Sequence, residues 1–232
     1  MLASLDGKID GAFFSMPETA PALKEYAALR KFYRCQATLY GTTTMLGGYA
    51  DGPAPALPAD EQRAPGGDAE DYVDEAGRAM ENFIVSVDPA GALGFRSNCI
   101  ARKGRPAAHV IELLTRRAAP AYADYLRRLG ISYLFVGENR LDCGLALRKL
   151  QQRFSIERLM IAGGGMVNWS FLQEALIDEL SLVIAPVADG STCAVSIFER
   201  ADFLPPHAPV PFCLQEARRL EGDTLWLRYT RR

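Results

Sequence analysis

The chain has 232 residues, of which 49% are hydrophobic and 23% are charged, and its formal net charge is −2. This profile is typical of a globular protein with a sizeable buried core, and it gives no basic excess for binding nucleic acid. The sequence holds only two histidines and five scattered cysteines, with no Cys-x-x-Cys pair, so it does not favour a zinc site.

The same composition bears on location. An odd number of scattered cysteines is typical of a reducing compartment. The N-terminal stretch "MLASLDGKIDG" lacks the pattern of a signal peptide, and no apolar run reaches the length of a membrane-spanning helix. We therefore expect a cytoplasmic protein.

The first part of the chain begins with a short strand over 2–5, which ends at the turn signal Asp6-Gly7. Apolar residues at helical spacing predict a helix over Ala20–Tyr33, and the run "ATLYG" predicts a buried strand over Ala37–Gly41. A stretch rich in proline, glycine and acidic residues then predicts a long surface loop over 51–71.

Strands and helices alternate in the rest of the chain. Apolar runs predict strands over 82–88, Ala108–Leu114, 131–137, 159–162, 179–187 and a short piece at 195–198. Helical spacing predicts helices over 120–129, Cys143–Phe154 and 167–175. Two alternating runs around Gly222-Asp223 predict a C-terminal hairpin. This order predicts a single α/β layered domain over 1–232, with a mostly parallel mixed sheet and an antiparallel end.

Three consecutive glycines, Gly163, Gly164 and Gly165, stand where the strand over 159–162 gives way to a helix. In open α/β sheets ligands bind beyond the carboxyl ends of the strands, and the free N–H groups of a helix start attract phosphate. Two interpretations remain open, a cradle for a pyrophosphate or a tight turn that binds nothing. The pattern is not G-x-G-x-x-G and comes late in the chain, so neither a standard dinucleotide fingerprint nor a methyltransferase-like domain is favoured.

Three motifs together resemble the reductase domain of riboflavin biosynthesis, the RibD C-terminal domain. The opening "ASLDGKIDG" is similar to the family's Ser-Leu-Asp-Gly-Lys start, and "ATLYGTTTML" to its strand, glycine and threonine segment. "LMIAGGGMVNWSFLQEALIDELSLVIAPVADG" resembles its glycine loop, helix and Asp-Glu-Leu strand. The resemblance spans almost the whole chain and implies a three-layer α/β/α dihydrofolate-reductase-like fold, which binds NADPH over the carboxyl edge of its sheet.

The resemblance also implies cofactor-binding residues. Ala3, on the first strand, would lie beside the nicotinamide. Thr44 would open a short helix that touches the cofactor phosphates, together with Thr43, although N-capping is the simpler role for threonines 42–44. The glycine loop and the helix start would face the pyrophosphate and the nicotinamide ribose through Gly163, Gly164, Gly165, Met166, Val167 and Asn168.

Selection of NADPH over NADH needs positive charge for the 2′-phosphate. Thr115, Arg116 and Arg117 follow the strand that ends at Leu114, the right kind of place, and we favour this cluster. Arg102, Lys103 and Arg105 form a second basic cluster, and either cluster is equally compatible with a solvated surface.

The substrate side departs from the family pattern. The acid that precedes the Gly-Gly pair in the riboflavin enzymes is Ala162 here, and the aspartate that follows their threonine segment falls near Gly48. When a polar group of a substrate finds no hydrogen-bonding partner in the pocket, the enzyme discriminates strongly against that substrate. Asp6 is the catalytic candidate, as a group that orients substrate or relays a proton, although a strand-end turn explains it as well.

These observations predict an NADPH-dependent reductase, similar to 5-amino-6-(5-phosphoribosylamino)uracil reductase, that transfers hydride to a small heterocyclic or sugar-imine substrate. Two alternatives stay open: a dihydrofolate-reductase-like enzyme on another substrate, and a non-catalytic nucleotide-binding domain. The family resemblance further implies a homodimer formed through the later strands. We expect no metal, nucleic-acid or membrane partner.

Overall fold

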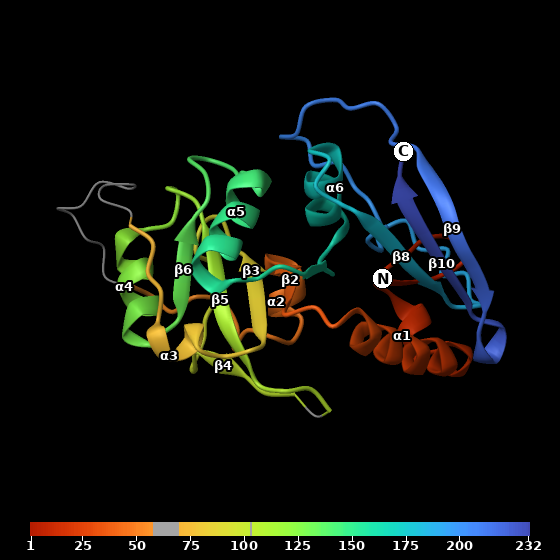
Figure 1. The fold of residues 1–232 in the computed structure, drawn as a ribbon, viewed down its shortest axis with the longest axis horizontal. Coiled ribbons are helices and arrows are strands. Elements are labelled where there is room, and N and C mark those ends of the chain that lie inside the picture. The colour runs from red at the N-terminus through yellow and green to blue at the C-terminus, as the bar shows by residue number, and fades with distance from the viewer. Residues whose placement is uncertain (58–69, 103) are drawn as a thin grey trace. The chain divides into compact units, whose positions relative to one another are not determined.

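The computed structural model describes residues 1–57, 70–102 and 104–232, and the chain forms two compact units. The terminal unit combines Met1–Cys35 with Gly164–Arg232, and the central unit is Gln36–Gly163. The colours of Figure 1 show this division, since the red and blue ends of the chain share one unit and the yellow and green segments form the other.

The central unit is built on a mostly parallel sheet. Its parallel strands are β2 (Ala37–Gly41), β3 (Phe83–Val87), β5 (Ala108–Leu114), β6 (Ser132–Phe135) and β7 (Leu159–Ile161). The order is β7-β2-β3-β5, and β6 pairs with β5. A short strand, β4 (Cys99–Ile100), runs antiparallel to the start of β5.

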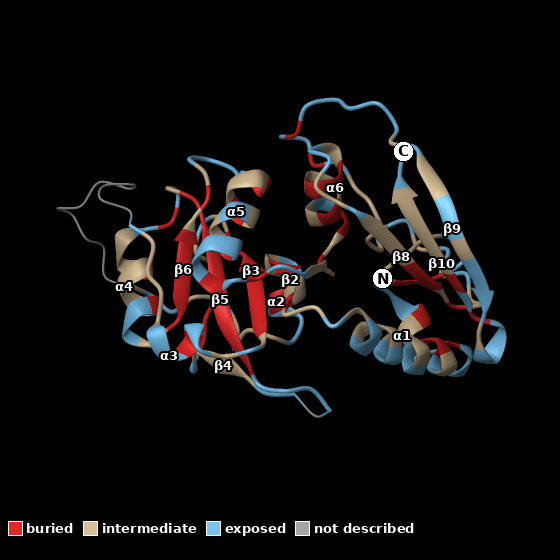
Figure 2. Cartoon of the chain, viewed as in Figure 1, coloured by how far each residue is buried: buried red, intermediate tan, exposed pale blue. Residues whose placement is uncertain are grey.

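Helices cover both faces of this sheet. On one face Tyr122 and Leu126 of α4 (Pro120–Arg128) join a buried apolar cluster with Val110 and Leu114 of β5. On the other, the Phe154 ring of α5 (Cys143–Phe154) contacts the Phe83 ring of β3, with centroids 5.6 Å apart. Strands β3 and β5 are therefore buried along their whole length, as Figure 2 shows in red.

The terminal unit has its own sheet, in the order β1-β8-β10-β9. Its strands are β1 (Leu2–Ala3), β8 (Glu179–Ile184), β9 (Phe212–Arg219) and β10 (Leu225–Arg231). Helix α1 (Ala20–Tyr33) packs on one face of this sheet, in a core that includes Leu2, Val183 and Trp226. Helix α6 (Gly165–Gln173) follows the glycine loop, and 3₁₀ turns lie at Ala12–Ser15, Pro17–Thr19 and Glu221–Asp223.

Most predicted elements are present with small shifts at their ends. The predictions for α1, β2, β5 and α5 match residue for residue, and the C-terminal hairpin is the antiparallel pair β9–β10. The predicted strand over 195–198 is wrong, since that segment holds only an isolated bridge between Lys8 and Ser196. Helix α3 (Glu75–Arg78) and β4 were not predicted, because both are too short to show a period. Of the loop predicted over 51–71, residues 58–69 lie outside the described residues.

Candidate functional site

The carboxyl edge of the central sheet gathers several of the predicted residues. Because β2, β3, β5, β6 and β7 are parallel, the segments that follow them emerge at one edge. The threonine segment, Thr115 with Arg116, and Gly163 all belong to this edge. The other predicted residues, Ala3, Asp6 and 164–168, belong to the terminal unit.

The threonine segment forms the short helix α2 (Thr42–Leu46). This helix begins at Thr42 rather than at Thr44, and Gly41 caps it without any side-chain hydrogen bond, so the expectation of threonine N-capping is wrong. The Thr42 hydroxyl instead donates to the Val87 carbonyl, 2.8 Å away, and ties α2 to the end of β3. Thr43 is exposed and Thr44 half-buried, and neither hydroxyl bonds to a described residue, which leaves both for a ligand.

The favoured basic cluster is largely engaged in the structure. Thr115 is fully buried and its hydroxyl donates to the Pro89 carbonyl at 2.7 Å, so this side chain joins two chain segments. Arg116 pairs with Glu138, with Nε and Oε1 2.9 Å apart. Of this cluster, Arg117 is the exposed member.

The three glycines differ in what surrounds them. A Cβ on Gly163 would lie 2.5 Å from the Gly41 nitrogen and 2.6 Å from the Tyr40 Cα, so the backbone of β2 requires a glycine there. A Cβ on Gly165 would lie 2.5 Å from the Ser196 carbonyl oxygen. A Cβ on Gly164, the N-cap of α6, would meet no atom within 4 Å. Packing therefore explains two of the glycines, and only Gly164 opens onto free space.

The first turn of α6 offers main-chain donors rather than side chains. Met166 is exposed and Val167 is half-buried. The Asn168 side chain is buried and its Nδ2 donates to the Ile197 carbonyl at 2.8 Å, so it holds the neighbouring loop. The first N–H groups of a helix lack partners within the helix, and they carry the positive end of its dipole. This turn suits an anionic group placed over Gly164.

Asp6 is held as a carboxylate by three hydrogen bonds. It accepts from the Ser4 hydroxyl at 2.5 Å and from the backbone N–H groups of Asp189 and Gly190 at 3.0 and 2.9 Å. The hydrogen bond from Ser4, followed by those from the two backbone groups, lowers the pKa of Asp6 well below its usual range. Nearby Ala3 is completely buried and its carbonyl accepts from the Ala185 N–H, so only its small size can matter to a ligand.

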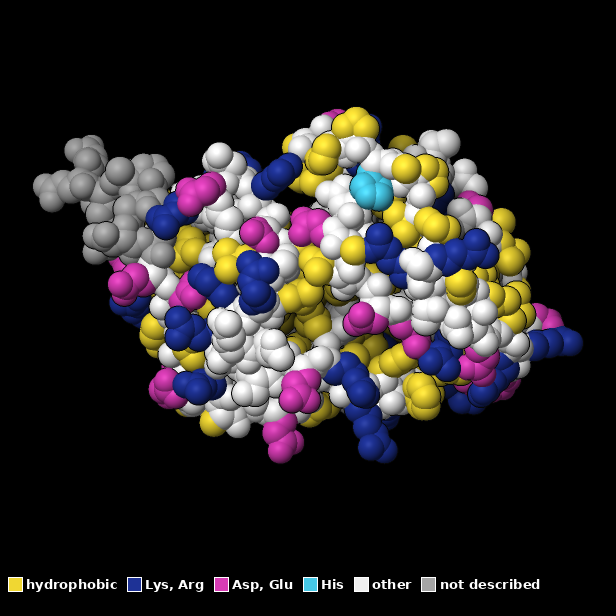
Figure 3. Space-filling view, turned by 45° about the horizontal axis from the view of Figure 1, so that its top comes forward, with side chains coloured by type: hydrophobic (Ala, Val, Ile, Leu, Met, Phe, Trp, Pro, Cys, Tyr) yellow, Lys and Arg dark blue, Asp and Glu magenta, His cyan; other side chains and the backbone are white. Residues whose placement is uncertain are grey.

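The structure also bears on the remaining classes of partner. No group of three metal-ligating side chains gathers anywhere in the part of the chain that is described. Within the same residues, every helix is too short or too polar to span a membrane. On the face drawn in Figure 3, acidic and basic side chains are mixed rather than segregated.

Comparison with protein families identifies the chain's relatives. The RibD C-terminal domain model matches residues 1–225, through both units. The chain belongs to the RibD C-terminal domain family. Two curated relatives, both named 2,5-diamino-6-ribosylamino-4(3H)-pyrimidinone 5′-phosphate reductase, come from Aquifex aeolicus and Methanothermobacter thermautotrophicus. The Aquifex protein is 33% identical over 76 residues, which is 33% of this chain and 34% of the relative. The Methanothermobacter protein is 28% identical over 197 residues, or 84% and 80% of the two chains.

Solved structures of RibD-type proteins share the fold. A pyrimidine reductase-like protein from Corynebacterium diphtheriae superposes with a TM-score of 0.68 at 18% identity, covering 100% of this chain and 89% of that one. RibD from Acinetobacter baumannii has a TM-score of 0.59 at 20% identity, and the chain spans 56% of it. The predicted dihydrofolate-reductase-like α/β fold, with its mostly parallel sheet, is confirmed.

Proposed function

We propose that this RibD C-terminal domain protein is an NADPH-dependent reductase that acts on a ribosylamino-pyrimidine phosphate or a closely similar heterocycle. The family match over 1–225 and the names of both curated relatives support this reaction class. The observation that carries the coenzyme assignment is Gly164, which opens onto free space at the start of α6.

NADPH fits the groups available at these positions. Within the terminal unit, the bare backbone at Gly164 and the first N–H groups of α6 suit its pyrophosphate. Within the central unit, the hydroxyls of Thr43 and Thr44 are unengaged polar groups. Bound NADPH supplies the hydride, while the protein contributes orientation, charge and exclusion of water. Ala3 is completely buried, so it contributes only by being too small to obstruct the coenzyme.

Asp6 serves this reaction as an orienting carboxylate. Its lowered pKa keeps it ionised at neutral pH, so it accepts hydrogen bonds and has no proton to give. Its hydrogen bonds to the backbone at 189 and 190 hold the turn after β1 in place. The proton needed at the substrate therefore comes from another source, such as water.

Thermal unfolding of the full chain with NADPH, NADH or S-adenosylmethionine tests the coenzyme assignment. We expect NADPH to raise the melting temperature most, because a ligand that binds only the native state stabilises it, by about 2.7 kcal/mol at a hundred times its Kd. Oxidation of NADPH with the ribosylamino-pyrimidine phosphate, against dihydrofolate as the comparison substrate, tests the reaction. No shift with any of the three ligands would remove the proposal.

Ala162 favours one competing function, a nucleotide-binding domain without catalysis. This residue stands where the riboflavin reductases have an acid, and it packs against the apolar cluster of the central sheet rather than offering a polar group. A non-catalytic domain predicts binding of NADPH without oxidation against any substrate of the panel. Oxidation of NADPH with any pyrimidine substrate of the panel would support the reductase over the non-catalytic domain.

We also propose that the protein is a cytoplasmic homodimer. All five cysteines are free thiols, as in proteins of a reducing compartment. The β9–β10 pair carries apolar cross-strand neighbours on one face, including Leu214 opposite Tyr229. Leu214 and Leu225 are 55% and 40% exposed, and a second copy of the chain would cover them.

A further inference from the structure

Two arginines of the central unit contact a single tyrosine side chain. The Tyr49 ring stacks on the buried Tyr40 ring, with centroids 4.4 Å apart, and its hydroxyl donates to the Tyr40 hydroxyl at 2.9 Å. The Arg102 guanidinium lies over the Tyr49 ring, 4.1 Å from the centroid, and Arg105 Nη1 donates to the Tyr49 hydroxyl at 3.3 Å. Tyr40 thus anchors an aromatic platform that orders two exposed charges.

The chain brings these two arginines together through a tight turn. The Arg105 N–H donates to the Arg102 carbonyl at 3.0 Å, and Gly104 takes a left-handed φ of 78° within the turn. Because both guanidinium groups contact one tyrosine side chain, their like charges lie near each other and repel. A bound anion would relieve that repulsion.

No carboxylate among the described residues neutralises this pair. Arg102 and Arg105 take part in none of the ion pairs within residues 1–57, 70–102 and 104–232, whereas Arg116 of the other cluster is paired with Glu138. Gly48 lets the guanidinium come close, since Arg102 Nη2 lies 3.1 Å from the place where a Cβ would stand on that residue. The two planar donors are therefore ordered, charged and unneutralised.

We propose that Arg102 and Arg105, ordered by Tyr49, bind a phosphate monoester. Guanidinium groups recognise phosphate through paired, charge-assisted hydrogen bonds, and a dianion balances two arginines. Two sources carry such a group, the 2′-phosphate of NADPH and the phosphate of the pyrimidine substrate. The naming of these sources rests on the proposed function, but phosphate binding itself does not.

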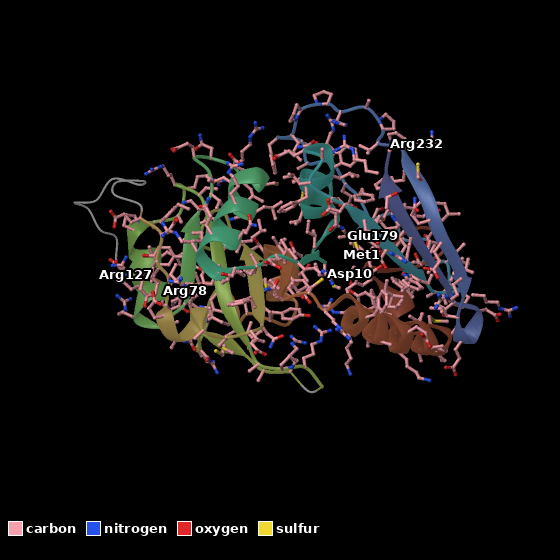
Figure 4. The ribbon with its side chains drawn as sticks, viewed as in Figure 1. Met1, Asp10, Arg78, Arg127, Glu179 and Arg232 are labelled. Carbon is pink, nitrogen blue, oxygen red and sulfur yellow. The ribbon has the colours of Figure 1, made fainter. Side chains whose placement is uncertain are left out.

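Titration of the full chain with inorganic phosphate at low ionic strength tests the site directly. The double variant R102Q/R105Q is expected to bind phosphate about tenfold more weakly or worse, through the loss of two charged donors. R78Q is the matched control, because Arg78, labelled in Figure 4, is an exposed arginine of the same unit whose carboxylate neighbour, Glu75, is 3.6 Å away. Equal phosphate binding by wild type and the double variant, or none by wild type, would overturn the site.

Two further measurements identify the source of the phosphate. A fall of about tenfold in the NADPH-over-NADH affinity ratio of R102Q/R105Q assigns the site to the coenzyme. A similar rise in KM for the phosphorylated substrate, with kcat and the dephosphorylated substrate unaffected, assigns it to the substrate. If neither changes, the assignment of the site to these two ligands is wrong, and the phosphate titration alone decides whether the site binds phosphate. If wild-type protein does not bind NADPH, the proposed function is refuted, and the phosphate titration still tests the site formed by Arg102 and Arg105.

Tyr49 is a positioning residue in this proposal. Variants of Tyr49 and Arg102 distinguish the contribution of the aromatic ring from that of the guanidinium charge. Y49F keeps the ring under Arg102 and removes the hydroxyl that Arg105 contacts. Y49L removes the platform, so we expect it to weaken phosphate binding more than Y49F does. R102K, which keeps the charge without the planar fork, should recover only part of the affinity. Equal phosphate binding by Y49F, Y49L and wild type would contradict the role given to Tyr49.

Discussion

At the scale of single residues, the glycine loop gives a sharp test of the coenzyme assignment. Gly164 faces open space, so a side chain there should leave the fold intact, while a carboxylate would repel a pyrophosphate. We expect G164D to abolish measurable NADPH binding and G164A to weaken it less, because the methyl group obstructs but carries no charge. Calorimetric titration with NADPH, together with cooperative unfolding of each variant, checks this. Wild-type affinity in G164D would show that the loop is only a turn.

A second residue, Glu112, predicts a pH dependence of stability. It is completely buried on β5, opposite Ser86 of β3, and burial followed by the nearby Asp88 charge raises its pKa well above the ordinary 4.5. A carboxyl whose pKa is higher in the folded state contributes stability below its unfolded pKa, and this contribution is lost as pH rises through the folded value. Between these two pKa values the free energy of unfolding falls by up to about 1.4 kcal/mol per pH unit.

The variant E112Q isolates this effect, since an amide of similar shape does not titrate. Urea unfolding at pH 4.5 and above should show that the free energy of unfolding of E112Q increases relative to that of wild type as pH rises. Asp88, whose pKa burial also raises, is present in both proteins, so the comparison reports Glu112 together with its coupling to Asp88. Parallel stability curves would mean that Glu112 does not change protonation on folding.

At the scale of elements, α5 shows a helix whose start is set by one side chain. Asp142 precedes the helix, and its Oδ1 accepts from the Leu145 N–H at 2.7 Å. Removing such a cap costs about 1 kcal/mol of stability. We expect D142A to lose that much in urea unfolding, and D142N, which keeps an accepting oxygen, to lose a fraction of it. An unchanged D142A would mean that packing alone holds the end of α5.

The same scale explains which elements the sequence predicts well. Helices α1 and α5 and strands β2 and β5 show a clear period or a continuous apolar run, so local pattern and buried position agree. Helix α2 begins earlier than expected, because Gly41 rather than a threonine occupies its cap. Backbone geometry at the end of β2 sets where α2 begins, and the residue pattern does not predict this position.

At the scale of the whole molecule, the proposed dimer makes a prediction about the β9–β10 face. A lysine at the exposed position 214 would place a charge inside the apolar contact, at a desolvation cost that nothing repays. We expect L214K to be monomeric in analytical ultracentrifugation under conditions in which wild type is dimeric. K24Q, which changes an exposed residue of α1 on the Trp226 face of the sheet, opposite the face of Leu214 and Leu225, should leave the dimer intact. A monomeric wild type, or a dimeric L214K, would refute this interface.

The sequence by itself determined the alternation of strands and helices and the family, because apolar periods and the order of three motifs are local properties of the chain. Tertiary structure decided which candidates are engaged by packing or hydrogen bonds and which are left open. Packing against β2 engages Gly163 and leaves Gly164 free, and the Asn168 amide turns inward to a carbonyl. Likewise, Tyr49 meets Arg102 only because folding brings two distant segments to one place. Such roles depend on which atoms lie within contact distance across the fold, and local sequence patterns carry no information about that distance.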